Sequence, residues 1–90
     1  MATLQREVKI VNKYGLHARP AMQFVETANR FNCKIEVANG PLAVDAKSIM
    51  SVMRLAATKG TTLKLLADGE DAADAVEALA KLVADSFGEP

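Results

Sequence analysis

The chain is organised around residues 12–21, which read NKYGLHARPA. This stretch holds the only histidine, His17, two residues before Arg19 and at the point where a glycine-marked loop gives way to a helical pattern. Pro20 fits the first turn of a helix, because the N–H group that proline lacks would have no partner inside the helix there. A helix start presents free backbone N–H groups and the positive end of a dipole, which together favour an anion. His17 therefore precedes a site suited to phosphate, and Arg19 can donate forked hydrogen bonds to the same anion.

On both sides of this stretch, apolar periodicity predicts a strand and a helix. Residues 4–11 alternate as a strand, with Val8 and Ile10 facing the core. A helix follows, which begins at Ala18 or Pro20 and ends near Arg30. The residue before a proline avoids helical dihedrals, so Arg19 is either the cap of this helix or one of its first residues. The expected inner face of this helix consists of Ala18, Ala21, Phe24, Val25, Ala28 and Phe31.

The rest of the pattern predicts three more strands and two more helices. The strands cover residues 33–38, 42–45 and 61–67, and the helices cover residues 48–55 and a segment from about 72 to 85. Pro41, directly after the hairpin signal Asn39-Gly40, favours a loop of more than two residues. We expect the tail at residues 88–90 to fray. The expected inner residues are Ile35, Val37, Val52, Leu55, Leu63, Leu65, Ala67, Ala72, Ala75, Val76, Leu79, Leu82 and Val83.

Two motifs resemble those of a known family. The segment GLHARPA at residues 15–21 resembles the active-site signature of HPr, the histidine-containing phosphocarrier of the bacterial phosphotransferase system. The segment KSIMSVM at residues 47–53 resembles the segment around the regulatory serine of HPr. The order β-α-β-β-α-β with a final helix indicates a two-layer α+β protein. The resemblance implies an open-faced β-sandwich, with a four-stranded antiparallel sheet covered on one face by three helices, in a single domain over residues 1–90.

The resemblance also implies a role for the histidine. His17 would accept a phosphoryl group at Nδ1 from enzyme I, derived from phosphoenolpyruvate, and pass it to an acceptor of the enzyme IIA type. A helix N-terminus disfavours imidazolium and so keeps the ring nucleophilic. Ala18 and Arg19 would bind the phosphoryl group, with Arg19 as its charge partner. Tyr14 stands where many HPr proteins have a small polar residue, and we expect it to pack beside the site rather than to offer its hydroxyl.

The second motif implies regulation and partner binding. Ser48 is expected to cap a short helix, and the resemblance makes it a target of HPr kinase/phosphorylase, although Ser51 departs from the glycine frequent at that place. A short helix on one sheet face cannot bury its whole circumference, so some of its apolar residues must face water. We expect an exposed partner-binding patch composed of Met22, Ile49, Met50 and Met53.

Composition excludes some functions. Eleven basic and eleven acidic residues, with 4% aromatic residues, argue against a nucleic-acid binder. Cys33 is the only cysteine, expected to be half-buried, and no segment resembles a signal peptide or a membrane span. We expect a cytoplasmic monomer without metal or cofactor, a recycled protein substrate rather than an enzyme.

Two other functions share these features. An acylphosphatase-like hydrolase has a related element order and an arginine-lined phosphate loop, but it would turn over small acyl phosphates without a phosphohistidine. A regulatory ligand-binding module would need no reactive histidine at all. The sequence also leaves open whether a carrier of this kind serves sugar transport or a purely regulatory phosphorelay.

Overall fold

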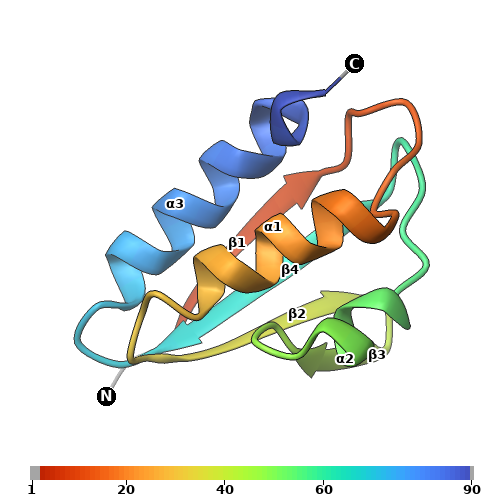
Figure 1. Ribbon diagram of the computed structural model, residues 1–90. Helices are drawn as coiled ribbons and strands as arrows, with labels where there is room; N and C mark the ends of the chain where they lie inside the picture. The colour runs from red at the N-terminus through yellow and green to blue at the C-terminus, as the bar shows by residue number, and fades with distance from the viewer. Residues whose placement is uncertain (1–2, 90) are drawn as a thin grey trace.

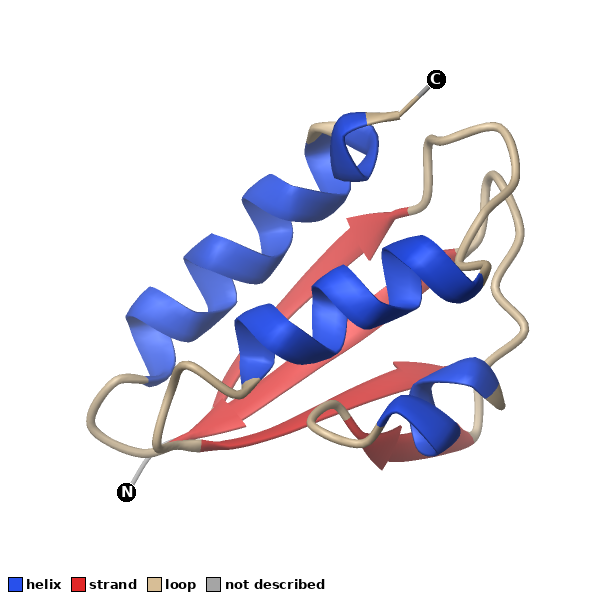
Figure 2. Cartoon of the chain, in the orientation of Figure 1, coloured by secondary structure: helices blue, strands red, loops and turns tan. Residues whose placement is uncertain are grey.

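A computed structural model describes residues 3–89, which form one sheet and one layer of helices (Figure 1). Figure 2 shows the helices over one face of the sheet, with the other face open. This is the predicted α+β open-faced sandwich. In chain order, the elements are β1 (Leu4–Lys9), α1 (Ala18–Ala28), β2 (Lys34–Asn39), β3 (Leu42–Asp45), α2 (Ile49–Met53), β4 (Thr62–Asp68), α3 (Ala72–Ala84) and the 3-10 turn η1 (Ser86–Gly88).

The sheet has the strand order β1-β4-β2-β3, and every neighbouring pair is antiparallel. The register pairs Val8 with Leu63 and Leu65 with Val37, so the inward side chains of three strands lie side by side. Because alternate side chains point to opposite faces of a strand, this register buries one face under the helices and leaves the other to water. The predicted inward set of the strands is confirmed.

The helices complete the core with the residues that their periodicity predicts, with one exception. Phe24 and Leu79 are fully buried, and Leu82 is half-buried against the core. Ala18 is exposed, contrary to expectation, because the buried arc of α1 runs through Pro20, Ala21, Phe24 and Ala28 and leaves Ala18 at its edge. Cys33 is more deeply buried than expected, with 4% of its surface exposed.

The loop between β2 and β3 is shorter than expected. Asn39 pairs with Leu42, so only Gly40 and Pro41 form the turn. Gly40 has φ +60°, a value that favours glycine. The missing N–H group of Pro41 costs no ladder hydrogen bond at the tip of the turn, which is why proline fits there.

The segment after α3 is ordered, so the expected fraying is wrong for Gly88 and Glu89; Pro90 lies outside the described residues. Phe87 is buried in the core, with 3% of its surface exposed, and it holds the 3-10 turn against the protein. Burial of an aromatic ring offsets the loss of chain entropy, which is the physical reason that this segment does not fray. In the described part of the chain, no helix has the length and apolar character needed to cross a membrane.

Candidate functional site

His17 is the N-cap of α1, with an extended backbone at φ −76° and ψ −175°. Its carbonyl oxygen accepts a hydrogen bond from the N–H of Ala21 at 3.0 Å, but its side chain makes no capping bond. The helix therefore begins at Ala18, and Arg19 lies in the first turn rather than at the cap. The His17 side chain is 41% exposed, so one side of the ring can meet another molecule.

The loop before His17 is fixed against the loop after α2. The N–H of Leu16 donates to the carbonyl oxygen of Ala57 at 2.8 Å, and the Leu16 side chain is buried. Gly15 has φ +66°, and a Cβ at this position would lie 2.4 Å from the same Ala57 oxygen. Only glycine fits there, since both the backbone conformation and the space exclude a side chain. This close approach sets the position from which His17 enters the helix.

Glu89 contacts the histidine, and the sequence did not predict this contact. Its Oε1 atom lies 2.7 Å from His17 Nε2 and 2.9 Å from Asn12 Nδ2. The hydrogen bond with His17 is the main cause that lowers the pKa of the Glu89 carboxyl. Asn12 is completely buried and also donates from Nδ2 to the Gly15 carbonyl oxygen at 2.7 Å. Glu89 lies 72 positions from His17, so no local pattern in the sequence predicts their contact.

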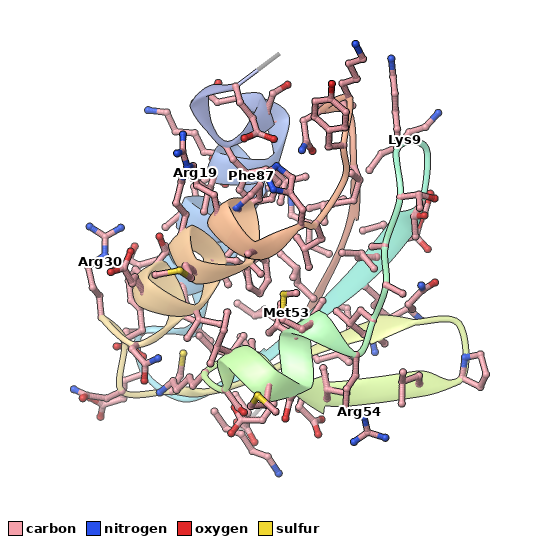
Figure 3. The ribbon with its side chains drawn as sticks, turned by 45° about the vertical axis from the view of Figure 1, so that its right-hand side comes forward. Lys9, Arg19, Arg30, Met53, Arg54 and Phe87 are labelled. Carbon is pink, nitrogen blue, oxygen red and sulfur yellow. The ribbon has the colours of Figure 1, made fainter. Side chains whose placement is uncertain are left out.

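Ala18 and Arg19 follow His17 directly in α1, and Tyr14 contacts its ring. The first backbone N–H groups of a helix have no partner within the helix, and in α1 these include the N–H groups of Ala18 and Arg19. Arg19 is exposed, and its charge contributes to the low pKa of Glu89; Figure 3 shows Arg19 and Phe87 at the same end of the molecule. The Tyr14 ring packs edge-on against His17 with 6.1 Å between ring centroids, yet it is 70% exposed.

Ser48 is the N-cap of α2, as predicted. Its Oγ accepts a hydrogen bond from the N–H of Ser51 at 3.3 Å. The preceding residue, Lys47, donates from Nζ to the carbonyl oxygen of Phe31 at 2.7 Å, which ties this corner to the end of α1. Ser48 is half-buried and lies directly before the exposed residues of α2.

Four apolar side chains on α1 and α2 are exposed, as predicted. They are Met50 (77%), Met22 (54%), Met53 (41%) and Ile49 (37%), and we call them the methionine patch. Val52 and Leu55 are buried, which agrees with the expected inner side of α2. Figure 3 shows Met53 on the side of α2 that faces α1, and the two helices are in contact. In residues 3–89, no group of three or more His, Cys, Asp or Glu residues could hold a metal ion.

Comparison with known proteins decides the family. The family model described as "PTS HPr component phosphorylation site" matches residues 4–85. The chain belongs to the HPr family. The phosphocarrier protein HPr of Pseudomonas putida is 51% identical over 85 residues, which cover 93% of this chain and 94% of that protein.

Solved HPr structures share the fold. The crystal structure of HPr-C-His from Thermoanaerobacter tengcongensis is 44% identical, covers 97% of this chain and 98% of its own, and superposes with a TM-score of 0.93. A structure described as an HPr dimer from the same organism is 46% identical, covers 91% of this chain and 94% of its own, and has a TM-score of 0.78.

Membership of the HPr family also decides between the classes of function that the sequence left open. The related proteins are named phosphocarriers, so the chain is a phosphocarrier rather than an enzyme. The acylphosphatase-like hydrolase is thereby excluded.

Proposed function

We propose that His17 accepts a phosphoryl group from enzyme I, which obtains it from phosphoenolpyruvate, and passes it to a phosphotransferase-system protein of the enzyme IIA type. The observation that carries this proposal is the position of His17, half-exposed at the cap of α1 and next to the free N–H groups of the first turn. A neutral imidazole nitrogen can attack phosphorus, and the helix N-terminus then receives the negative charge.

Ala18 and Arg19 bind the transferred group in this proposal. The backbone N–H groups of the first turn donate to phosphoryl oxygens, and the Arg19 guanidinium compensates their charge during transfer. Phosphoryl transfer depends mainly on positioning and electrostatic stabilisation, so no further reactive side chain is needed. Arg19 is exposed, so its guanidinium can contact the phosphoryl group both when enzyme I delivers it and when the acceptor removes it.

The methionine patch is the proposed docking surface for enzyme I and for the downstream acceptor. Met22 lies on the same helix as His17, one turn further along, and Met50 and Met53 extend the apolar surface onto α2. Methionine suits a surface that meets several partners, because its flexible thioether adapts to different shapes. One surface could therefore serve both the donor and the acceptor of the phosphoryl group.

We also propose that HPr kinase/phosphorylase modifies Ser48. Its hydroxyl lies at the start of α2, and a phosphate there would stand next to the methionine patch. The added charge suits a helix N-terminus but opposes an apolar contact with a partner. We further propose that residues 1–90 form a single domain and that the carrier acts in the cytoplasm as a monomer. The elution volume in size-exclusion chromatography tests the monomeric state.

The decisive experiment is incubation with phosphoenolpyruvate and enzyme I, followed by intact mass measurement. We expect the gain of one acid-labile phosphate in the wild-type chain and none in His17→Ala. The variant should keep its circular dichroism spectrum, because His17 lies at a loop–helix junction outside the core. Phosphate on the His17→Ala variant would contradict the proposal, and so would the absence of phosphate on the wild type.

A further inference from the structure

Lys13 and Tyr14 form the tip of a tight turn just before the histidine. The N–H of Gly15 donates to the carbonyl oxygen of Asn12 at 3.2 Å, and the Asn12 side chain donates from Nδ2 to the carbonyl oxygen of Gly15 at 2.7 Å. Asn12 is fully buried, so the base of the turn is fixed inside the protein. The two central residues are exposed at a defined place, which lowers the entropy cost of a contact with another molecule.

The fold does not require a tyrosine at the tip of this turn. Central positions of tight turns favour glycine, proline, asparagine, aspartate and serine. The Tyr14 ring is 70% exposed and does not belong to the hydrophobic core. Its neighbours are the Lys13 ammonium, 5.3 Å from the ring centroid, and the His17 ring at 6.1 Å between centroids. A cation over one face orients an exposed ring, and tyrosine is enriched among the residues that dominate protein–protein contacts.

The segments around this turn are basic and contain no acidic residue. Residues 8–25 and 46–67 lack Asp and Glu, yet they carry seven of the eleven Lys and Arg residues. The two segments lie side by side, because the N–H of Gly60 donates to the carbonyl oxygen of Ile10 at 2.7 Å. Lys59, directly before Gly60, is exposed there. Although the net charge of the chain is zero, positive charge is therefore concentrated around the turn.

The charge of Lys13 is available to another molecule. Among residues 3–89, the two ion pairs join Arg6 to Glu77 and His17 to Glu89, so no carboxylate in this part of the chain pairs with Lys13. Glu89 is the acid closest to the histidine, and the bond with His17 already engages it. An exposed ammonium without a partner in its own chain suits a carboxylate of another protein.

Acidic residues gather at the opposite end of β4. This seven-residue strand begins at Thr62, after the basic loop, and ends at Asp68, and residues 68–74 hold four acids. A strand of that length separates the two groups of charges by about 20 Å. Figure 3 shows Lys9 at the same end of the molecule as Arg19. Such a separation of charge draws a negatively charged partner to the positive end and orients it.

We propose that Lys13 and Tyr14 form a contact site for the phosphoryl donor, separate from the methionine patch, that recognises a carboxylate beside the phosphoryl group of the donor. This inference rests on the proposed transfer to His17. The Lys13 ammonium pairs with that carboxylate, and the Tyr14 ring packs against the surface around it.

The direction of transfer favours the donor over the acceptor as the occupant of this site. The donor arrives with the charge of the phosphoryl group, which the cations around the turn attract. Once His17 carries the group, its charge of about −1.5 to −2 offsets those cations. The hold on the donor then weakens, and the donor can leave.

The charge and the ring are tested separately. Lys13→Glu reverses the charge, and Lys34→Glu is the matched control, because Lys34 is also exposed but lies at the start of β2 opposite Asp68. Tyr14→Ala removes the ring, whereas Tyr14→Phe keeps the ring without its hydroxyl. The melting temperature of each variant shows whether it folds, and Lys13→Gln takes the place of Lys13→Glu if the latter does not fold.

The first measurement is the initial rate of phosphorylation by phosphorylated enzyme I at varied carrier concentration. Lys13→Glu should raise KM by about tenfold at low salt and leave kcat unchanged, since charges at the rim of a contact act on association. The difference should shrink in about 0.5 M salt, which screens exposed charges. Tyr14→Ala should raise KM by about fivefold at both salt concentrations, and Tyr14→Phe should match wild type. Equal KM values for Lys13→Glu and Lys34→Glu, or a wild-type KM for Tyr14→Ala, would overturn the inference.

The second measurement is transfer from the phosphorylated carrier to the acceptor, where we expect equal rates for all variants. A defect of Lys13→Glu in this step alone would make the site an acceptor site and overturn the proposal. If the wild type is not phosphorylated at all, the proposed function fails, and a binding titration with enzyme I tests the contact site by itself. Weaker binding of Lys13→Glu than of Lys34→Glu would then support the site, whereas equal binding or no binding would contradict it.

Discussion

His17 depends on residues that lie outside its own helix. Gly15 permits the close approach to Ala57 that positions the loop, and Glu89 contacts the ring from the segment after α3. Arg19 is the one charged neighbour that the motif itself supplies, two residues along the chain. At this scale the proposed phosphoryl site therefore combines a local sequence motif with contacts from distant residues.

Arg19→Lys tests the role of the guanidinium. Lysine keeps the charge but loses the planar fork, so transfer should slow by about tenfold to a thousandfold, in line with the loss of one electrostatic donor in other transfer reactions. Binding to enzyme I should be unchanged, because the methionine patch is intact. Stopped-flow phosphorylation measures the transfer, and a binding titration measures the affinity for enzyme I. Arg30→Lys is the control, because Arg30 is an exposed arginine just after the other end of α1. Unchanged transfer in Arg19→Lys would leave Arg19 without a role in the chemistry.

Ser48→Asp tests the charge at the second motif. Aspartate is also a good N-cap, so the melting temperature should stay within about a few degrees of wild type. Phosphorylation of His17 by enzyme I should slow, because a partner must desolvate the new charge beside the methionine patch. Ser48→Ala is the control, since it loses the cap, about 1 kcal/mol, and leaves the patch neutral. Equal rates for Ser48→Asp and wild type at limiting carrier concentration would reduce Ser48 to a helix cap.

At the scale of elements, α2 is too short to bury more than one side. Its five residues place Val52 in the core and leave Ile49, Met50 and Met53 at the surface. A surface helix normally balances its apolar stripe with polar residues on the outer side. The outer side of α2 is apolar instead, and α1 extends that surface with Met22. An exposed apolar surface of this kind fits the proposed docking surface, because such patches often mark interaction sites.

Met50→Glu tests this surface. The Met50 side chain is 77% exposed, so the substitution should change the melting temperature little while it weakens the complex with enzyme I by about tenfold or more. Isothermal titration calorimetry gives the affinity. Val52→Ala is the opposite control, because Val52 is fully buried and its truncation should lower the melting temperature but leave the affinity of the folded protein unchanged. A drop of many degrees for Met50→Glu would mean that Met50 belongs to the core.

At the scale of the whole molecule, single contacts join elements that are distant in sequence. The Asp71 carboxylate, at the start of α3, accepts hydrogen bonds from the N–H groups of Asn32 at 2.8 Å and Cys33 at 2.9 Å. These bonds, the Asn32 bond first, lower the pKa of Asp71 below its ordinary value of 3.8. The pKa of the Cys33 thiol is raised, mainly by its burial and then by the neighbouring Asp71 carboxylate.

The low pKa of Asp71 predicts the direction of acid sensitivity. A carboxyl whose pKa is lower in the folded than in the unfolded state stabilises the protein fully above the unfolded value. That stability is lost as the pH falls below 3.8 and through the folded pKa. Asp71→Asn should therefore lower the melting temperature at neutral pH and flatten its fall in acid. Asp74→Asn, exposed on α3, is the control; a parallel acid profile for Asp71→Asn and wild type would show that this carboxylate does not contribute.

Much of this protein follows from its sequence alone. The alternation of residues such as Val8 and Leu63 predicts the inner face of the sheet, and the period of α1 and α3 predicts their buried sides. The motif GLHARPA identifies His17 and Arg19 as the candidate reactive pair. The predictions of the buried faces are confirmed because periodicity depends on residues only a few positions apart, whereas the reactive role of His17 and Arg19 stays a prediction.

Other features were decided only by the tertiary structure. The two-residue turn at Gly40 and Pro41 follows from the pairing of Asn39 with Leu42, which local turn preference did not predict. The contact of Glu89 with His17 exists because α3 packs on the sheet and Phe87 fills the core, and these events direct the chain back to the first helix. A residue pair 72 positions apart has no local signal. Its geometry is set by how the elements pack, because only packing brings such residues within hydrogen-bond distance.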